Sequence, residues 1–160
     1  MPAPEHDAIP GGDSGERSIG APPGELRGRP VDNLGELVGI EYLGDPARSD
    51  GHVRARVEIG ERIRQPYGIV HGGAYATIAE SMCSIGTAAG VKDEGMIAMG
   101  QSSQASFLRP AREGTLHAEA RARHRGRSTW IWDCEISDDE GRLCAMVRMT
   151  VAVRPAPSSG

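Results

Sequence analysis

The chain has few cysteines, and this shortage excludes two classes of protein. Its 160 residues include three, Cys83, Cys134 and Cys144. Three scattered thiols are too few for a disulfide framework or a zinc cage, so we predict no metal site and a reduced compartment. A thiol nucleophile needs a nearby base, and Cys83 has only Glu80 within a helical turn. We therefore expect all three to be small core residues.

Long apolar runs are also absent. No stretch approaches the roughly 18 apolar residues that cross a bilayer, so we expect no membrane partner. The start MPAPEHDAIPGG has no basic segment followed by an apolar core, which is the pattern of a secretory signal. A cytoplasmic location is the expectation that follows.

The amino-terminal 33 residues lack aromatic side chains and hold six of the eleven prolines. Such a segment buries too little apolar area to offset the entropy of ordering, so we predict a disordered tail over residues 1–33. Its six acidic residues and three arginines account for most of the net charge of −4. The remaining body is close to neutral, which argues against binding nucleic acid.

The most informative stretch is HGGAYATIAESMCSIGTAAG, residues 71–90, in which Glu80 is the single charged residue. Its apolar residues recur at intervals of three and four, which predicts a helix; they are Tyr75, Ile78, Met82, Ile85 and Ala89. Polar residues with similar spacing predict a polar seam along the opposite edge of the helix; they are Thr77, Glu80, Ser84 and Thr87. Because exposed helices usually carry several charges, this helix is expected to be buried nearly all round.

Two glycines precede the first turn of this helix. Free N–H groups and the positive end of the helix dipole lie there, so Gly72 and Gly73 could receive a polarised carbonyl oxygen. The alternatives are a turn that needs backbone freedom and a solvated Glu80.

Strands are predicted elsewhere by alternation of apolar and polar residues. The predicted strands lie at about 38–43, 52–59, 96–108, 116–123, 130–136 and 143–153. Two strands, one long helix and four strands with short turns suggest an antiparallel meander that curves around the helix, an α+β architecture. We expect a bend at Gly100, and exposed sheet edges favour pairing with a second copy.

Four segments resemble the hotdog-fold acyl-CoA thioesterases, most closely the Arthrobacter-type 4-hydroxybenzoyl-CoA thioesterases. They are RQPYGIVHGGAYATIAESMCS, GMIAMGQSSQASFLRPAREG, STWIWDCEISDDEGRLCAM and AVRP. Thioesterases of the phenylacetate-degradation and menaquinone pathways share the HGG helix. The resemblance implies a hotdog domain at 34–155, followed by a disordered end at 156–160. Hydrolysis of an aromatic acyl-CoA is the implied activity, with coenzyme A as part of the substrate and no cofactor.

Site residues follow from the same resemblance. Glu80 matches the catalytic carboxylate, Gly72 the N–H that polarises the thioester carbonyl, and Gln65 a polar side chain near the reacting carbon. Ser84 stands where the family has a threonine that supports the second step, so a hydroxyl remains.

Coenzyme A contacts are implied at Arg109 and in the RSTW segment, at Ser128 and the adjacent Thr129. Arg127 replaces a serine of the close relatives, and PAPSSG replaces their basic carboxyl-terminal end. We therefore include Arg127 among the substrate-binding residues and expect the nucleotide contacts to be redistributed.

Helix geometry gives an independent expectation. Gly72 and Glu80 are eight residues apart, or about 12 Å along a helix axis, whereas both groups must lie within a few ångströms of one carbonyl. The site must therefore combine Gly72 of one subunit with Glu80 of another. A homodimer is the minimal active unit, and we expect a homotetramer.

Two other functions stay open. His71 could be the general base of a hotdog enoyl-CoA hydratase or dehydratase, although its simpler role is to shape the turn before the helix. A non-catalytic acyl-CoA sensor is the second alternative.

Overall fold

The structure, a computed structural model, describes residues 33–46 and 50–156. Apart from Asn33 and Ala156, the two predicted disordered ends lie outside these residues. Its elements are α1 (Leu34–Val38), β1 (Glu41–Tyr42), β2 (His52–Glu58), η2 (Glu61–Ile63), α2 (Gly72–Val91), η3 (Lys92–Glu94), β3 (Met96–Phe107), β4 (Thr115–Arg125), β5 (Thr129–Ser137) and β6 (Leu143–Pro155). None of the helices in these ranges is long and apolar enough to cross a membrane.

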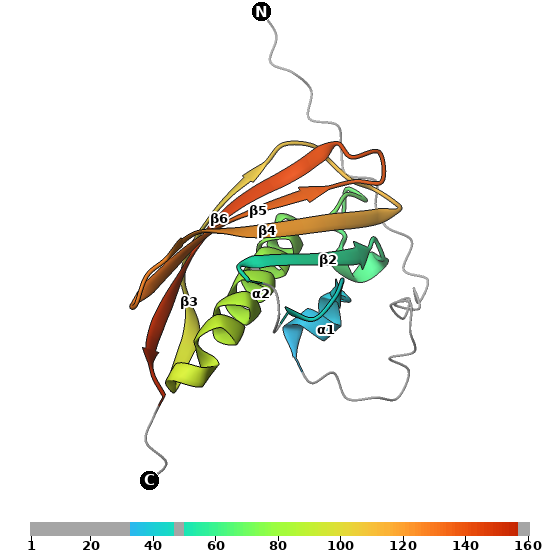
Figure 1. The fold of residues 1–160 in the computed structure, drawn as a ribbon. Coiled ribbons are helices and arrows are strands. Elements are labelled where there is room, and N and C mark those ends of the chain that lie inside the picture. Colours follow the sequence, from blue (N-terminus) through green and yellow to red (C-terminus); the bar gives the residue numbers. More distant parts are fainter. Residues whose placement is uncertain (1–32, 47–49, 157–160) are drawn as a thin grey trace, which may run out of the picture.

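A curved sheet wraps around α2, which confirms the predicted hotdog architecture (Figure 1). The sheet has six strands in the order β1-β2-β4-β5-β6-β3, and every neighbouring pair is antiparallel. The predicted meander is right for β4, β5 and β6 but wrong for β3. This strand pairs with β6 and forms one edge of the sheet, so the chain passes from β3 at that edge to β4, which lies between β2 and β5.

The predicted strand at 38–43 is also shorter than expected. Its first residue, Val38, belongs to α1, because the Asn33 side chain accepts the Glu36 N–H at 3.0 Å and starts a helical turn. Gly39 ends that turn in the left-handed region at φ 82°, where glycine has no steric penalty. Only Glu41–Tyr42 remain to pair with β2.

Two tryptophans of β5 hold α2 against the sheet. A Cβ atom at Gly86 would lie 2.7 Å from the Trp132 ring, and one at Gly90 would lie 2.6 Å from the Trp130 ring. The helix can approach the rings this closely because both positions are glycine. Trp132 also donates its indole N–H to the buried Thr87 hydroxyl at 2.9 Å. This packing fixes the rotation of α2 about its axis.

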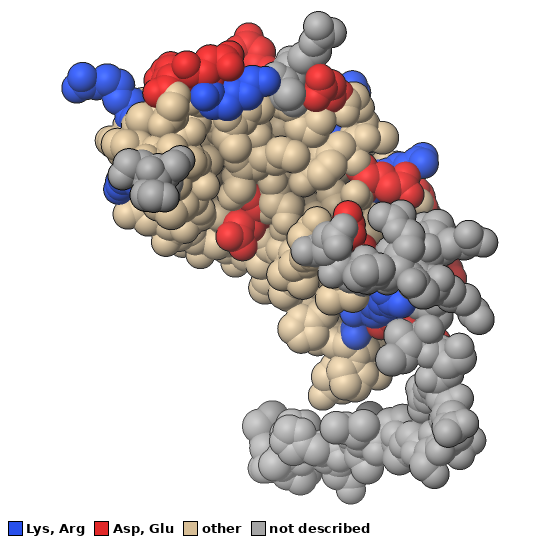
Figure 2. Space-filling view, turned by 90° about the horizontal axis from the view of Figure 1, so that it is seen from below, with Lys and Arg blue, Asp and Glu red and all other residues tan. Residues whose placement is uncertain are grey.

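Contrary to the expectation from its sequence, α2 is not buried all round in the single chain. Thr87, predicted to share a polar seam with Glu80, is fully buried, whereas Glu80 and Ala88 are exposed and Ile85 is 37% exposed. The sheet curves around one side of the helix and leaves the other side open (Figure 1). Viewed from below, the molecule shows a broad face of uncharged residues with isolated acidic atoms within it (Figure 2).

The outer face of the sheet carries a cross-strand ion-pair cluster around Asp133. Arg148 donates from Nε and Nη2 to the Asp133 carboxylate at 2.7 and 3.0 Å, and Arg123 donates from Nε at 2.9 Å. The hydrogen bonds from Arg148, with those from Arg123, hold the pKa of Asp133 below its ordinary value of 3.8 against the opposing effect of partial burial.

We expect Asp133→Asn to lower the free energy of unfolding by about 1 kcal/mol at neutral pH. Because the folded-state pKa is depressed, this contribution is complete above the unfolded pKa of about 4 and is lost as the pH falls through the folded value. Urea unfolding at pH 7 and at pH 3 measures it, with the exposed Asp93→Asn as the matched control. An equal difference between wild type and Asp133→Asn at both pH values would contradict the assignment.

Candidate active site

The amino-terminal end of α2 presents one unused backbone donor. His71 is the N-cap, and its Nδ1 accepts the Gly73 N–H at 2.9 Å, which is the local role expected from its position. Ala74 donates its N–H to the His71 carbonyl at 2.9 Å. Within the described ranges, no group accepts the Gly72 N–H. At a helix N-terminus such a donor is suited to an oxyanion or a polarised carbonyl.

A cavity of about 510 Å³ opens beside this donor. Two other predicted site residues, Gln65 and Arg109, line it together with Gly72. The turn that presents Gln65 is closed by the Gly68 N–H, which donates to the Gln65 carbonyl at 2.9 Å. The structure therefore brings three of the predicted residues together.

Two aromatic residues that we did not predict for the site also line this cavity, namely Tyr75 and Phe107. Their ring centroids lie 6.0 Å apart. A Cβ atom at Gly72 would lie 2.9 Å from the Phe107 ring, so this ring rests directly against the helix N-terminus. The single phenylalanine of the chain was a signal that we did not use, and Tyr75 was assigned only to the apolar stripe of the helix.

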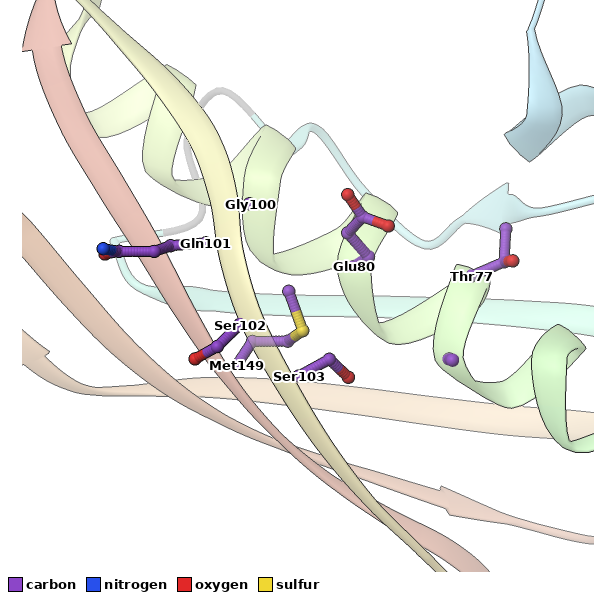
Figure 3. Close-up of a pocket in the computed structure, with 8 residues that line it drawn as sticks. Thr77, Glu80, Gly100, Gln101, Ser102, Ser103 and Met149 are labelled. Atoms are coloured by element: carbon purple, nitrogen blue, oxygen red, sulfur yellow. The ribbon is translucent and has the colours of Figure 1, made fainter.

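Glu80 lines a separate cavity of about 250 Å³, between α2 and β3. It projects from the helix beside Gly100, Ser102 and Ser103 of the strand (Figure 3). In the part of the chain that the structure describes, no ion pair or hydrogen bond engages its carboxylate. In particular, the Ser84 hydroxyl, one helical turn further along, makes no hydrogen bond to this carboxylate in those ranges.

The two candidate groups do not meet within one chain. The donor at Gly72 and the carboxylate at Glu80 line different cavities, and the helix separates them by about 12 Å along its axis. A single carbonyl group cannot contact both within one chain.

The remaining predicted residues lie at the turn between β4 and β5. Arg127 and Ser128 are exposed, and Thr129 is half-buried at the start of β5. Arg154 of β6, which we did not predict, donates from Nη1 to the Ser128 carbonyl at 2.9 Å. None of these residues lines the two cavities described above.

Comparison with known proteins identifies the family. Residues 67–145 match the family model described as the thioesterase superfamily. The chain is 34% identical to a mutant thioesterase of Pseudomonas aeruginosa, whose crystal structure superposes with a TM-score of 0.73, covering 78% of this chain and 88% of that one. The chain belongs to the thioesterase superfamily.

Two named relatives of the chain extend the comparison. The chain is 32% identical over 121 residues to the 1,4-dihydroxy-2-naphthoyl-CoA hydrolase of Listeria monocytogenes, covering 76% of this chain and 95% of that protein. It is 33% identical over 130 residues to the proofreading thioesterase EntH of Cronobacter turicensis, covering 80% and 90%. Its activity is therefore that of a thioester hydrolase.

The cysteines of this thioesterase are poorly suited to act as nucleophiles. Cys83, Cys134 and Cys144 are all buried and unpaired by disulfides. Burial raises the pKa of Cys134 to about 12 and raises that of Cys83 as well, so neither forms a thiolate readily. Over residues 33–46 and 50–156, no three His, Cys, Asp or Glu side chains cluster as metal ligands.

Proposed function

We propose that this thioesterase hydrolyses aromatic acyl-CoA thioesters, with 4-hydroxybenzoyl-CoA as the representative substrate, at a site shared by two subunits. The observation that carries the proposal is the separation on α2 of an unused donor, Gly72 N–H, from an unpaired carboxylate, Glu80. Water is the only other reactant. Coenzyme A arrives as part of the substrate, so no cofactor is required.

A second copy of the chain supplies the missing half of each site. Among the described strands, β3 pairs with β6 alone, and its other edge has no partner strand over the 12 residues Met96–Phe107. Beside this edge lies the open side of α2, where Ile85 is 37% exposed, and β3 itself exposes Met99 at 47%. Pairing about a twofold axis would cover these surfaces and bring Glu80 of the partner subunit toward Gly72. The homodimer is the minimal active unit, and we propose that two dimers form a homotetramer.

The chemistry follows from the two groups. Gly72 N–H donates to the thioester oxygen, where the helix dipole favours the negative charge that develops. Glu80 either attacks the carbonyl carbon to form a mixed anhydride, which water then hydrolyses, or removes a proton from an attacking water. In both routes the C–S bond breaks, coenzyme A leaves as its thiol after taking up a proton, and water supplies the new oxygen of the acid.

Preference for an aromatic acyl group is supported by the larger cavity. Tyr75 and Phe107 face it with ring centroids 6.0 Å apart, and Ile69, Val70 and Leu108 complete an apolar lining. A planar acyl ring can make further aromatic contacts with this tilted pair, whereas a flexible alkyl chain cannot. Gln65 and Arg109 add polar groups at the same cavity.

Replacement of the carboxylate tests the catalytic role directly. We expect Glu80→Gln to lower kcat by about 10²- to 10⁴-fold, because an amide is neither a base nor an effective nucleophile. Inhibition by free coenzyme A should stay unchanged. Release of thiol from 4-hydroxybenzoyl-CoA measures turnover, and the exposed Glu113→Gln is the matched control. Wild-type kcat in the Glu80→Gln protein would refute this mechanism.

A substrate panel tests the acyl preference and the alternatives. We expect kcat/KM for 4-hydroxybenzoyl-CoA to exceed that for butyryl-CoA by about tenfold or more, since loss of an aromatic contact of about 1.5 kcal/mol gives this ratio. Crotonyl-CoA is included to detect hydration of a double bond without thiol release, the result expected of a hydratase. Equal values for aromatic and aliphatic substrates would contradict the aromatic preference.

A further inference from the structure

The strand opposite Glu80 is irregular at one point. Gly100 pairs with Val151 of β6, but Ser102 pairs with Thr150, so Gln101 is an extra residue without a partner. In a regular strand, side chains alternate between the two faces, so residues three positions apart point to opposite faces. Because of this bulge, Gly100 and Ser103 are an exception, and both pair with inward-facing residues of β6. The bulge thus turns both Gly100 and Ser103 toward α2.

Both residues are small, in contrast to their neighbours. On β6 the paired inward positions are Val151 and Met149, which are buried. Since β3 places no large side chain at the matching positions, space remains between the strand and the helix. The Glu80 cavity lies there, with Gly100 and Ser103 on its wall (Figure 3).

At position 100 there is no room for a side chain larger than that of glycine. A Cβ atom at this position would lie 2.8 Å from Glu80 Oε1 and 3.5 Å from Glu80 Cδ and Cγ, and no closer group stands in its way. The backbone does not require glycine, because Gly100 is absent from the residues with positive φ. Among the described residues, the Glu80 side chain is therefore the nearest obstacle to alanine, and its Oε1 is the atom that a Cβ atom would meet first.

We propose that Gly100 is a positioning residue that sets the place of the Glu80 carboxylate. The absence of a Cβ atom at Gly100 lets the Glu80 carboxylate lie against β3. The bulge places Gly100 on the face of the strand that is directed toward this carboxylate. This inference rests on the proposed function, in which Glu80 acts on the thioester.

A methyl group at Gly100 would displace the carboxylate rather than the fold. Ordinary contacts with a Cβ atom lie at 3.4 to 4 Å, so Oε1 must move by more than half an ångström. The carboxylate is the end of a flexible side chain and can move without disturbing the backbone. Displacements approaching 1 Å at a reacting group cost up to about 10²-fold in rate.

Gly100→Ala is the test, with 4-hydroxybenzoyl-CoA as substrate and Gly60→Ala as the matched control. Nothing lies within 4 Å of a Cβ atom at Gly60, and its φ is −103°. We expect Gly100→Ala to lower kcat by about 10- to 100-fold, with KM and Tm close to wild type. In a Glu80→Gln background the same substitution should cause no further loss of the residual rate, because it acts through Glu80.

Three results would overturn the positioning role. They are a wild-type kcat for Gly100→Ala, a rise in KM without loss of kcat, and an equal loss of rate with and without Glu80. If Glu80→Gln is inactive while Gly100→Ala is fully active, only the positioning role fails. If Glu80→Gln is active, the proposed function itself fails.

A stability measurement covers the case in which Gly100→Ala does not fold. In a Glu80→Ala chain the obstacle is gone, so Gly100→Ala should be accommodated there with a Tm close to that of Glu80→Ala alone. A double variant that also fails to fold would show that the methyl group meets something other than the carboxylate, and would overturn the proposal.

Discussion

The length of one α-helix constrains this site more than any other feature. Two groups eight residues apart on α2 are separated by about 12 Å along the axis, and no bend within a packed helix removes that distance. The chain places its free N–H donor at one of these positions and its unpaired carboxylate at the other. An acyl-CoA carbonyl needs both within a few ångströms. If both groups act on one carbonyl, the reaction requires two copies of the helix.

Small residues set the position of that helix. Gly86 and Gly90 let it approach the tryptophans of β5, which fixes its rotation. Gly100 leaves space where the helix meets β3. The open side of α2 and the free edge of β3 then coincide, so the surface that a second copy would cover is the one that carries Glu80. Gly86 and Gly90 therefore determine how the helix packs, and Gly100 determines the space around the carboxylate of the proposed reaction.

Much of the fold could be predicted from the spacing of apolar residues. Alternation of apolar and polar residues indicates a strand with one solvent-exposed face, and apolar residues at intervals of three and four indicate a helix. The helix was placed at 71–90 and lies at Gly72–Val91. Strand order was not predictable in this way: alternation says which face is buried but not which strand is the neighbour, so β3 was wrongly placed next to β4. The predicted strand at 38–43 began too early, because the helical turn capped by Asn33 extends to Val38.

The candidate site was predicted in part. A lone charge in an uncharged helix drew attention to Glu80, and the paired glycines drew attention to Gly72. Spacing alone wrongly put Thr87 on the same seam, since the Trp132 indole binds its hydroxyl in the core. Tyr75 and Phe107 were missed because an apolar pattern does not separate core residues from cavity walls.

Mixing two inactive variants tests the shared site most directly. The first carries Glu80→Gln; the second carries Gly72→Pro, which removes the N–H at a position where helices tolerate proline, with Phe107→Ala to make room for the ring. If each site uses Gly72 of one subunit and Glu80 of the other, a mixed dimer holds one intact site. Equal amounts, dissociated and reassociated, should then recover about a quarter of wild-type thioesterase activity, since half the dimers are mixed. No recovery after mixing, with mixed dimers shown to be present, would contradict the account.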